Sequence, residues 1–207
     1  MVNSIKAING PWEKCIVVPY GVPQPSFIQI KQRKNNSFNK PLNILTVGTV
    51  CLRKGIQYIL QAAEELIGKC EFTIIGNKPY KFKKTINIPP NVKLLPHTPN
   101  LNLYYEKADI FLLPSLAEGS ALACYEALQY GLPLIVTPNT GMFIENGVHG
   151  FEIPIKSSNA IVEAIEKFLK QPELLETFST SALQLSQYAS YNAYKQRLND
   201  LLLKNFI

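Results

Sequence analysis

Short apolar runs alternate with amphipathic segments along most of the chain, beginning near residue 43. The apolar runs are nearly continuous and several end in glycine, which is typical of buried strands. They predict strands at 43–48, 71–76, 91–95, 109–113, 132–136 and, more briefly, 150–153. Between them, apolar residues recur three and four positions apart. This second pattern predicts helices at 55–68, 101–107, 120–130 (with Ser120 as N-cap) and 159–170, and from Pro172 to the end.

Alternating strands and helices predict an α/β fold, in which a parallel sheet carries helices on both faces. The predicted C-terminus is helical. Ligands of such sheets bind in the crevice outside the carboxyl ends of the strands. That rule points to the loops that follow Gly48, Gly76, Leu113 and Val136.

Residues 1–42 do not belong to this repeat. Within them, residues 31–40 are polar and rich in turn formers, which is typical of a linker or a surface loop. The sequence therefore predicts an N-terminal, linker-like segment over 1–42 and one α/β domain over 43–207.

The composition excludes several classes of protein. Of the 207 residues, 46% are hydrophobic and 17% charged, which argues against disorder. No apolar run approaches the ~20 residues of a membrane span, and residues 1–10 lack the layout of a secretory signal. The cysteines are far apart and two histidines stand alone, so we expect no metal site and a reducing, cytoplasmic environment. These residues are Cys15, Cys51, Cys70, Cys124, His97 and His149.

The net charge of +6 is unevenly distributed. Residues 1–103 carry 14 Lys/Arg and 4 Asp/Glu, with basic clusters at 31–34, 53–54 and 78–84. No aromatic stripe accompanies these clusters and no nucleic-acid-binding motif is present, so we expect no nucleic-acid partner. A solvated surface or a small ligand that contains phosphate accounts for them.

The loop after the first predicted strand reads Gly-Thr-Val-Cys-Leu-Arg-Lys-Gly over residues 48–55. Its glycines permit tight turns, and the following helix offers backbone N–H groups to an anion. Arg53 and Lys54 add positive charge at that point. An ordinary turn with two solvated cations is the alternative. Neither a Walker loop nor a G-x-G-x-x-G fingerprint occurs in the chain.

The loop after the fourth predicted strand carries a second pattern. Glu118 and Gly119 precede the predicted helix, and Glu126 lies six residues beyond Ser120, roughly 9 Å along a helix. A helix N-terminus that takes a diphosphate, with a carboxylate for a polyol on either side, matches the layout of a nucleotide sugar. A helix-dipole glutamate followed by an exposed helix glutamate remains the alternative.

Several segments, taken in order, resemble the C-terminal, donor-binding half of the family 4 (group 1) retaining glycosyltransferases, which have the GT-B fold. They are Val-Val-Pro-Tyr-Gly-Val-Pro at 17–23, Arg-Lys-Gly at 53–55, Ala-Asp-Ile-Phe-Leu-Leu-Pro-Ser at 108–115, Glu-Gly at 118–119 with Glu-Ala-Leu at 126–128, and Gly-Leu-Pro-Leu-Ile at 131–135. The resemblance extends over most of the chain, and the two glutamates eight positions apart are its most specific part. It implies a Rossmann-like domain that binds a nucleotide sugar.

The resemblance also implies roles for individual residues. Lys54, with an arginine, would bind the donor diphosphate, Glu118 would contact the transferred sugar, and Glu126 would hold the ribose hydroxyls. The implied reaction transfers a sugar from a nucleoside diphosphate sugar to an acceptor hydroxyl, with retention and without a metal or other cofactor. The candidate catalytic residues are Glu118 and Lys54, and the donor-binding candidates are Arg53, Lys54, Gly119, Ser120, Ala121 and Glu126.

Three positions depart from the family pattern. Thr49 stands where the family arginine usually lies, and Arg53 is the candidate replacement. Ser120 and Ala121 replace the usual Phe-Gly after Glu118-Gly119. Pro96 replaces the glycine that commonly follows the third strand, which affects recognition of the base near His97.

The acceptor-binding domain of a GT-B enzyme has no counterpart in the chain, and residues 17–23 resemble the interdomain linker. The expected partners are the donor, an acceptor that is a sugar, a lipid-linked sugar or another hydroxyl compound, and a partner chain with an acceptor domain. Attachment to the membrane through a missing N-terminal domain is a further option. A non-catalytic nucleotide-sugar-binding subunit and a sugar-nucleotide epimerase remain open as alternatives.

Overall fold

The computed structural model describes residues 2–24, 40–77 and 87–206. Six strands form one parallel sheet in the order β3-β2-β1-β4-β5-β6. The strand order reverses between β1 and β4, so the sheet has its topological switch point there. The strands are β1 (Leu42–Val47), β2 (Cys70–Ile75), β3 (Val92–Leu95), β4 (Ile110–Leu113), β5 (Leu134–Val136) and β6 (Gly150–Glu152).

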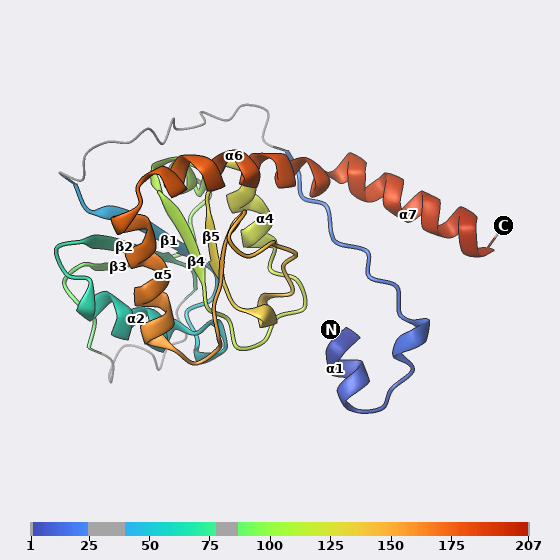
Figure 1. Ribbon diagram of the computed structural model, residues 1–207, viewed down its shortest axis with the longest axis horizontal. Coiled ribbons are helices and arrows are strands. Elements are labelled where there is room, and N and C mark those ends of the chain that lie inside the picture. Colours follow the sequence, from blue (N-terminus) through green and yellow to red (C-terminus); the bar gives the residue numbers. More distant parts are fainter. Residues whose placement is uncertain (1, 25–39, 78–86, 207) are drawn as a thin grey trace.

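Helices cover both faces of this sheet, as the sequence predicted. Figure 1 shows α2 and α5 together on one face, and α6 running along one end of the sheet before α7 projects away from it. The α-helices are α1 (Val2–Ala7), α2 (Ile56–Glu65), α3 (Asn102–Lys107), α4 (Leu122–Gln129), α5 (Ser158–Lys170), α6 (Glu173–Tyr188) and α7 (Tyr191–Phe206). Short 3₁₀ turns lie at Trp12–Lys14 (η1), Leu52–Lys54 (η2) and Pro138–Thr140 (η4).

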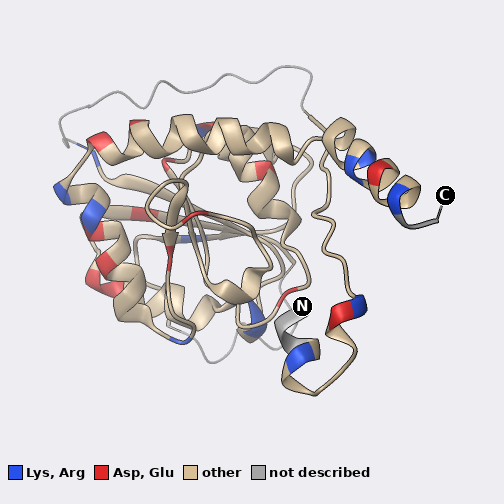
Figure 2. Cartoon of the chain, turned by 45° about the vertical axis from the view of Figure 1, so that its right-hand side comes forward, with Lys and Arg blue, Asp and Glu red and all other residues tan. Residues whose placement is uncertain are grey.

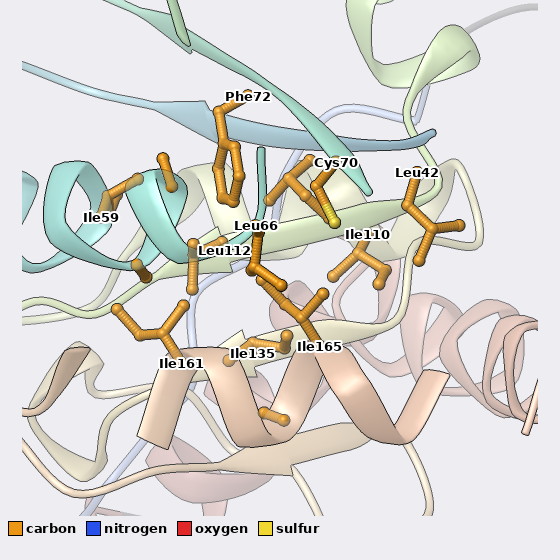
Figure 3. Packing of buried hydrophobic residues seen from close by; sticks show 14 of the residues in the cluster. Leu42, Ile59, Leu66, Cys70, Phe72, Ile110, Leu112, Ile135, Ile161 and Ile165 are labelled. Atoms are coloured by element: carbon orange, nitrogen blue, oxygen red, sulfur yellow. The ribbon is translucent and has the colours of Figure 1, made fainter. Parts of the chain in front are cut away.

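The alternation of side chains along the strands builds two apolar layers. In β4, Ile110 and Leu112 belong to the layer under α2 and α5, whereas Phe111 and Leu113 belong to the layer with α3 and α4. Because every residue of β4 is buried, the strand is apolar throughout. Figure 3 shows the first layer, in which residues of α2 and α5 meet residues of the strands.

Three aromatic rings pack between the last strand, β6, and the helices that follow it. Phe151 of β6 lies edge-on to Phe168 of α5 and Phe178 of α6, with ring centroids 5.2 and 5.4 Å apart. Phe168 and Phe178 contact each other in the same way at 5.7 Å. Such pairs each contribute about 0.5–1.5 kcal/mol beyond the area they bury.

The linker-like residues before the sheet are bound to the junction between α6 and α7. The amide of Val22 donates to Ala189 O at 2.9 Å, and Arg197 of α7 donates to Pro19 O at 3.0 Å. A Cβ on Gly21 would lie 2.8 Å from Tyr194 Cβ, so this close approach requires glycine. The helix predicted from Pro172 onward is therefore two helices that meet where the linker crosses them.

Helix α4 differs from its prediction at its start. It begins at Leu122 with Ala121 at the N-cap position, and no side chain caps it. The Ala121 amide donates to Thr140 O in the loop after β5 at 3.1 Å, which holds the chain extended through this residue. The prediction that Ser120 caps the helix is therefore wrong, because a tertiary contact delays the helix.

The four cysteines differ in burial. Cys70 and Cys124 are buried, and burial raises the pKa of the Cys70 thiol to about 12. Cys15 and Cys51 are partly exposed, and all four are free thiols.

Helix α7 carries charges of both signs, with Lys195, Arg197, Asp200 and Lys204 (Figure 2). The predicted basic clusters at 31–34 and 78–84 lie outside the described residues. Within the described ranges, no helix combines the length and the apolar character that crossing a membrane requires.

Candidate functional site

The loops after β1 and β4 meet at the switch point of the sheet. Leu116 N donates to Arg53 O at 2.7 Å, which joins the two loops through their backbones. Gly55, at φ +73°, closes η2, and a Cβ on it would lie 2.1 Å from Pro114 O. Only glycine fits this left-handed, crowded position, so Gly55 fixes the approach of the two loops.

Arg53, Lys54 and Glu118 form one ion-pair cluster between these loops. Glu118 Oε1 lies 2.6 Å from Arg53 Nη1 and 2.7 Å from Lys54 Nζ. The Lys54 and Glu118 side chains are only 12% and 10% exposed, whereas Arg53 is 52% exposed. Ser115 Oγ donates to the same oxygen at 3.4 Å, and Arg53 also donates to Ala117 O at 2.9 Å.

The electrostatics of this cluster favour an ionised carboxylate between two cations. Burial alone raises the pKa of Glu118, but hydrogen bonds from Lys54 and Arg53 and their charges outweigh it and lower the pKa. The hydrogen bond with Glu118 and its charge raise the pKa of Arg53. Two cations against one carboxylate leave the cluster with a net positive charge, which suits an anionic ligand.

The loop after β5 supports the segment between Glu118 and α4. A Cβ on Gly141, at φ +65°, would lie 2.3 Å from Gly119 O, so the two loops touch through their backbones. Asn139 Nδ2 donates to Leu116 O at 2.8 Å on the same side. The Ala121 amide, which donates to Thr140 O at 3.1 Å, ties the same segment to the loop after β5.

Glu126 lies on α4 in a different environment from Glu118. The hydroxyl of Tyr105, on α3, donates to Glu126 Oε2 at 2.8 Å. Tyr105 is 2% exposed, whereas Glu126 is partly exposed. Within the described part of the chain, no lysine or arginine forms an ion pair with Glu126.

The structure thus brings three of the predicted residues, Arg53, Lys54 and Glu118, into direct contact. Gly119 and Ser120 follow Glu118 in the segment before α4, and Glu126 lies on α4, outside this ion-pair cluster. Sequence reasoning missed two supporting residues, Tyr105 and Gly141. The glycine after β5 was a detectable signal, whereas a tyrosine on a short apolar helix face looks like any core residue.

A largely apolar cavity of about 520 Å³ adjoins this site. Gly119, Ser120 and Gly141 line one side, and the N-terminal segment lines the other with residues that include Ile16 and Val17. The described part of the N-terminal segment therefore lies beside the loops that carry the predicted site.

The parallel sheet with helices on both faces places the chain among the Rossmann-like α/β proteins, and the ion-pair cluster lies at the switch point where such proteins bind ligands. Within that class, the model of the glycosyl transferases group 1 family matches residues 27–185, and the chain belongs to this family. The resemblance inferred from the motifs is confirmed by this match.

Individual relatives agree with the family. An uncharacterized glycosyltransferase of Haemophilus influenzae is 26% identical over 80% of this chain and 50% of its own. The amylovoran biosynthesis glycosyltransferase AmsK of Erwinia amylovora is 28% identical over 96% of this chain and 54% of its own. The chain spans about half the length of these curated relatives.

Solved structures confirm the expected fold. Anabaena Alr3699/HepE, in complex with UDP and glucose, superposes with a TM-score of 0.82 at 15% identity, over 98% of this chain and 60% of that one. The apo lipopolysaccharide outer core galactosyltransferase WaaB superposes with a TM-score of 0.79 at 17% identity, over 99% and 60%. The chain therefore has the fold of one half of a GT-B protein.

Proposed function

We propose that the chain is the donor-binding half of a retaining glycosyltransferase, which transfers a sugar from a nucleoside diphosphate sugar to an acceptor hydroxyl. The observation that carries the proposal is the cluster of Arg53 and Lys54 on Glu118 at the switch point. Ligands of open α/β sheets bind at such switch points. In a chain of this family, two cations held there by a rigid turn are suited to a diphosphate.

The proposed chemistry needs stabilisation of the departing nucleoside diphosphate. Lys54 and Arg53 supply positive charge that is fixed before the reaction, and fixed charges stabilise developing negative charge without reorganisation. Glu118 orients the sugar, and Glu126 accepts hydrogen bonds from the ribose hydroxyls. Positioning and electrostatics then account for most of the rate acceleration.

UDP is the first nucleotide to test. The solved structures of Anabaena Alr3699/HepE contain UDP and glucose or UDP-glucose, and that of pneumococcal GtfA contains UDP and GlcNAc. The acceptor is a sugar, a lipid-linked sugar or another hydroxyl compound.

The test is a thermal-shift and calorimetric panel of UDP, GDP, ADP and CMP on the full 207-residue chain. A ligand at about a hundred times its Kd adds ~2.7 kcal/mol of stability. A panel in which no nucleoside diphosphate binds would contradict the proposal.

Lys54→Ala then localises the binding. We expect this substitution to weaken the binding of UDP by about 1.5–3 kcal/mol, as for a lost charged hydrogen bond, and to leave the binding of uridine nearly unchanged. Lys170→Ala is the matched control, because Lys170 also pairs with a glutamate, Glu166 at 2.9 Å, but lies at the amino ends of the strands. Equal losses for UDP and uridine would show that Lys54 does not contact the phosphates.

A second candidate function is a non-catalytic subunit that binds the donor and requires a partner. The 207-residue chain spans about half the length of the curated relatives that it matches. We expect the 207-residue chain to bind a nucleotide yet release little UDP from UDP-glucose, with or without acceptors. Transfer restored by an added acceptor-domain chain indicates a split enzyme, whereas robust turnover by this chain alone would refute the need for a partner.

A further inference from the structure

Glu118 and Glu126 are held in contrasting ways. Glu118 is held by two cations, whereas Glu126 accepts from a neutral donor, the Tyr105 hydroxyl at 2.8 Å. A carboxylate with a single hydrogen bond on Oε2 retains acceptor capacity on Oε1 and a further lone pair on Oε2. Glu126 is therefore oriented and remains able to accept from other donors.

The ring of Tyr105 is itself fixed by packing. It lies parallel to Tyr130, with centroids 5.2 Å apart and planes 12° apart, and against Phe111 at 6.1 Å. With 2% exposure, the ring has no freedom to swing its hydroxyl away. The hydroxyl is thus a donor at a fixed point beside α4.

The hydroxyl also remains a donor across the working pH range. Burial first, and then the charge and hydrogen bond of Glu126, raise the pKa of Tyr105 well above its ordinary value. The Ala123 carbonyl oxygen lies farther from the hydroxyl, at 3.5 Å. The carboxylate is the nearer and the charged acceptor, so the Tyr105 hydroxyl donates its hydrogen bond to it.

We propose that Tyr105 is a positioning residue for ribose recognition: its hydroxyl fixes the Glu126 carboxylate so that the remaining acceptor positions meet the two ribose hydroxyls. This inference rests on the proposed function, in which Glu126 contacts the ribose. A free glutamate side chain would lose rotamer entropy when it bound a diol, and Tyr105 removes that cost in advance.

The test compares UDP with 2′-deoxy-UDP on the full chain by calorimetry. We expect the parent to prefer UDP, and Tyr105→Phe to reduce this preference about five- to tenfold while leaving the Kd of 2′-deoxy-UDP nearly unchanged. Phenylalanine keeps the stacked ring, so the melting temperature changes little. Tyr104→Phe is the matched control, since this neighbour on α3 also packs against the core, whereas the hydrogen bond to Glu126 comes from Tyr105.

A double-mutant cycle shows whether Tyr105 acts through Glu126. The double variant Tyr105→Phe/Glu126→Gln should lose no more of the UDP preference than Glu126→Gln alone, because both changes weaken the same contact between the positioned Glu126 carboxylate and the ribose. Additive losses would overturn the positioning role, as would an unchanged preference in Tyr105→Phe.

Other outcomes separate this inference from the proposed function. If UDP binds the parent and loses affinity in Lys54→Ala, but 2′-deoxy-UDP binds as tightly as UDP, the donor site stands and the Tyr105 role is refuted. If neither UDP, GDP nor ADP binds the parent, both proposals are refuted. A loss of affinity for UDP and 2′-deoxy-UDP alike in Tyr105→Phe indicates a structural hydrogen bond and also overturns the inference.

Discussion

Replacing Glu118 by glutamine removes one negative charge from between Arg53 and Lys54 and keeps the shape of the side chain. In the chain without ligand, the Glu118 carboxylate accepts from both cations at 2.6 and 2.7 Å. A bound diphosphate needs the same donors, so the carboxylate competes with it. We therefore expect Glu118→Gln to bind UDP more tightly than the parent does.

The size of the gain follows from the charges in the site. Two like unit charges, such as the Glu118 carboxylate and a bound phosphate, repel each other by about 3 kcal/mol when they lie about 5 Å apart at an effective dielectric constant of about 20. Because Arg53 is 52% exposed, water screens part of this interaction. We expect a gain of about 1–2 kcal/mol, or about five- to thirtyfold in Kd.

The same substitution lowers the stability of the fold. Lys54 and Glu118 are nearly buried, and a hydrogen bond to a charged group contributes about 1.5–3 kcal/mol. Because the folded-state pKa of Glu118 is lowered, its carboxylate stabilises the fold above the unfolded pKa of about 4.3 and loses that effect as the pH falls through the folded pKa. The unfolding free energies of parent and variant should differ at pH 7 and converge in acid.

Calorimetry with UDP and UDP-glucose, together with urea unfolding at several pH values, measures both effects. The affinity for UDP-glucose should increase less than the affinity for UDP, because the substitution weakens the proposed contact of Glu118 with the sugar. Glu166→Gln is the control, since it removes a carboxylate that pairs with Lys69 and Lys170 at the other end of the sheet. Weaker UDP binding by Glu118→Gln would refute the competition and show that the carboxylate instead holds the cations in place.

Two further predictions concern the framework of the site. Gly55→Ala should destabilise the chain by roughly 3 kcal/mol in urea unfolding, since it adds a clash with Pro114 O to the strain at φ +73°. Gly68→Ala, at φ +80° with open space around it, should lose only about 1 kcal/mol, and equal losses would exclude the clash. Arg197→Met should speed hydrogen exchange at the Val22 amide and leave the strands protected, because the guanidinium donates to carbonyls of the linker and of α6. Unchanged exchange at that amide would show that the linker is held without Arg197.

The fold was predictable because the central strands of its sheet are largely buried on both faces. A strand such as β4 is apolar at every position, so its presence follows from composition alone, although the predicted range of 109–113 begins one residue before Ile110. The third strand was predicted from Asn91 and begins at Val92, and the buried Asn91 side chain donates to Ala63 O and Cys70 O at 2.9 and 3.0 Å. Such tertiary hydrogen bonds carry no periodic signal.

The candidate site was predictable where chain connectivity alone brings residues together. Arg53, Lys54 and Glu118 follow two strands that are adjacent in the sheet, so a parallel-sheet rule places them at one edge. The partner of Glu126 was not predictable, because Tyr105 reaches α4 from another helix through packing. The assignment of Ser120 as the N-cap of α4 was wrong for the same reason, because the carbonyl that binds the Ala121 amide belongs to the loop after β5.

The contrast between the two glutamates gives the proposed donor a direction. Around Glu118 the cations outnumber the carboxylates, so the phosphates are drawn to that end of the segment before α4. Glu126 accepts from the neutral Tyr105 hydroxyl and forms no ion pair with any described residue, so its carboxylate repels phosphate while it accepts from hydroxyl groups. A nucleoside diphosphate placed the other way would set its phosphates against the Glu126 carboxylate, which is unfavourable, and would leave the two cations without their anionic partner. The orientation of the donor in this proposal therefore follows from charge alone, before any contact with the base is considered.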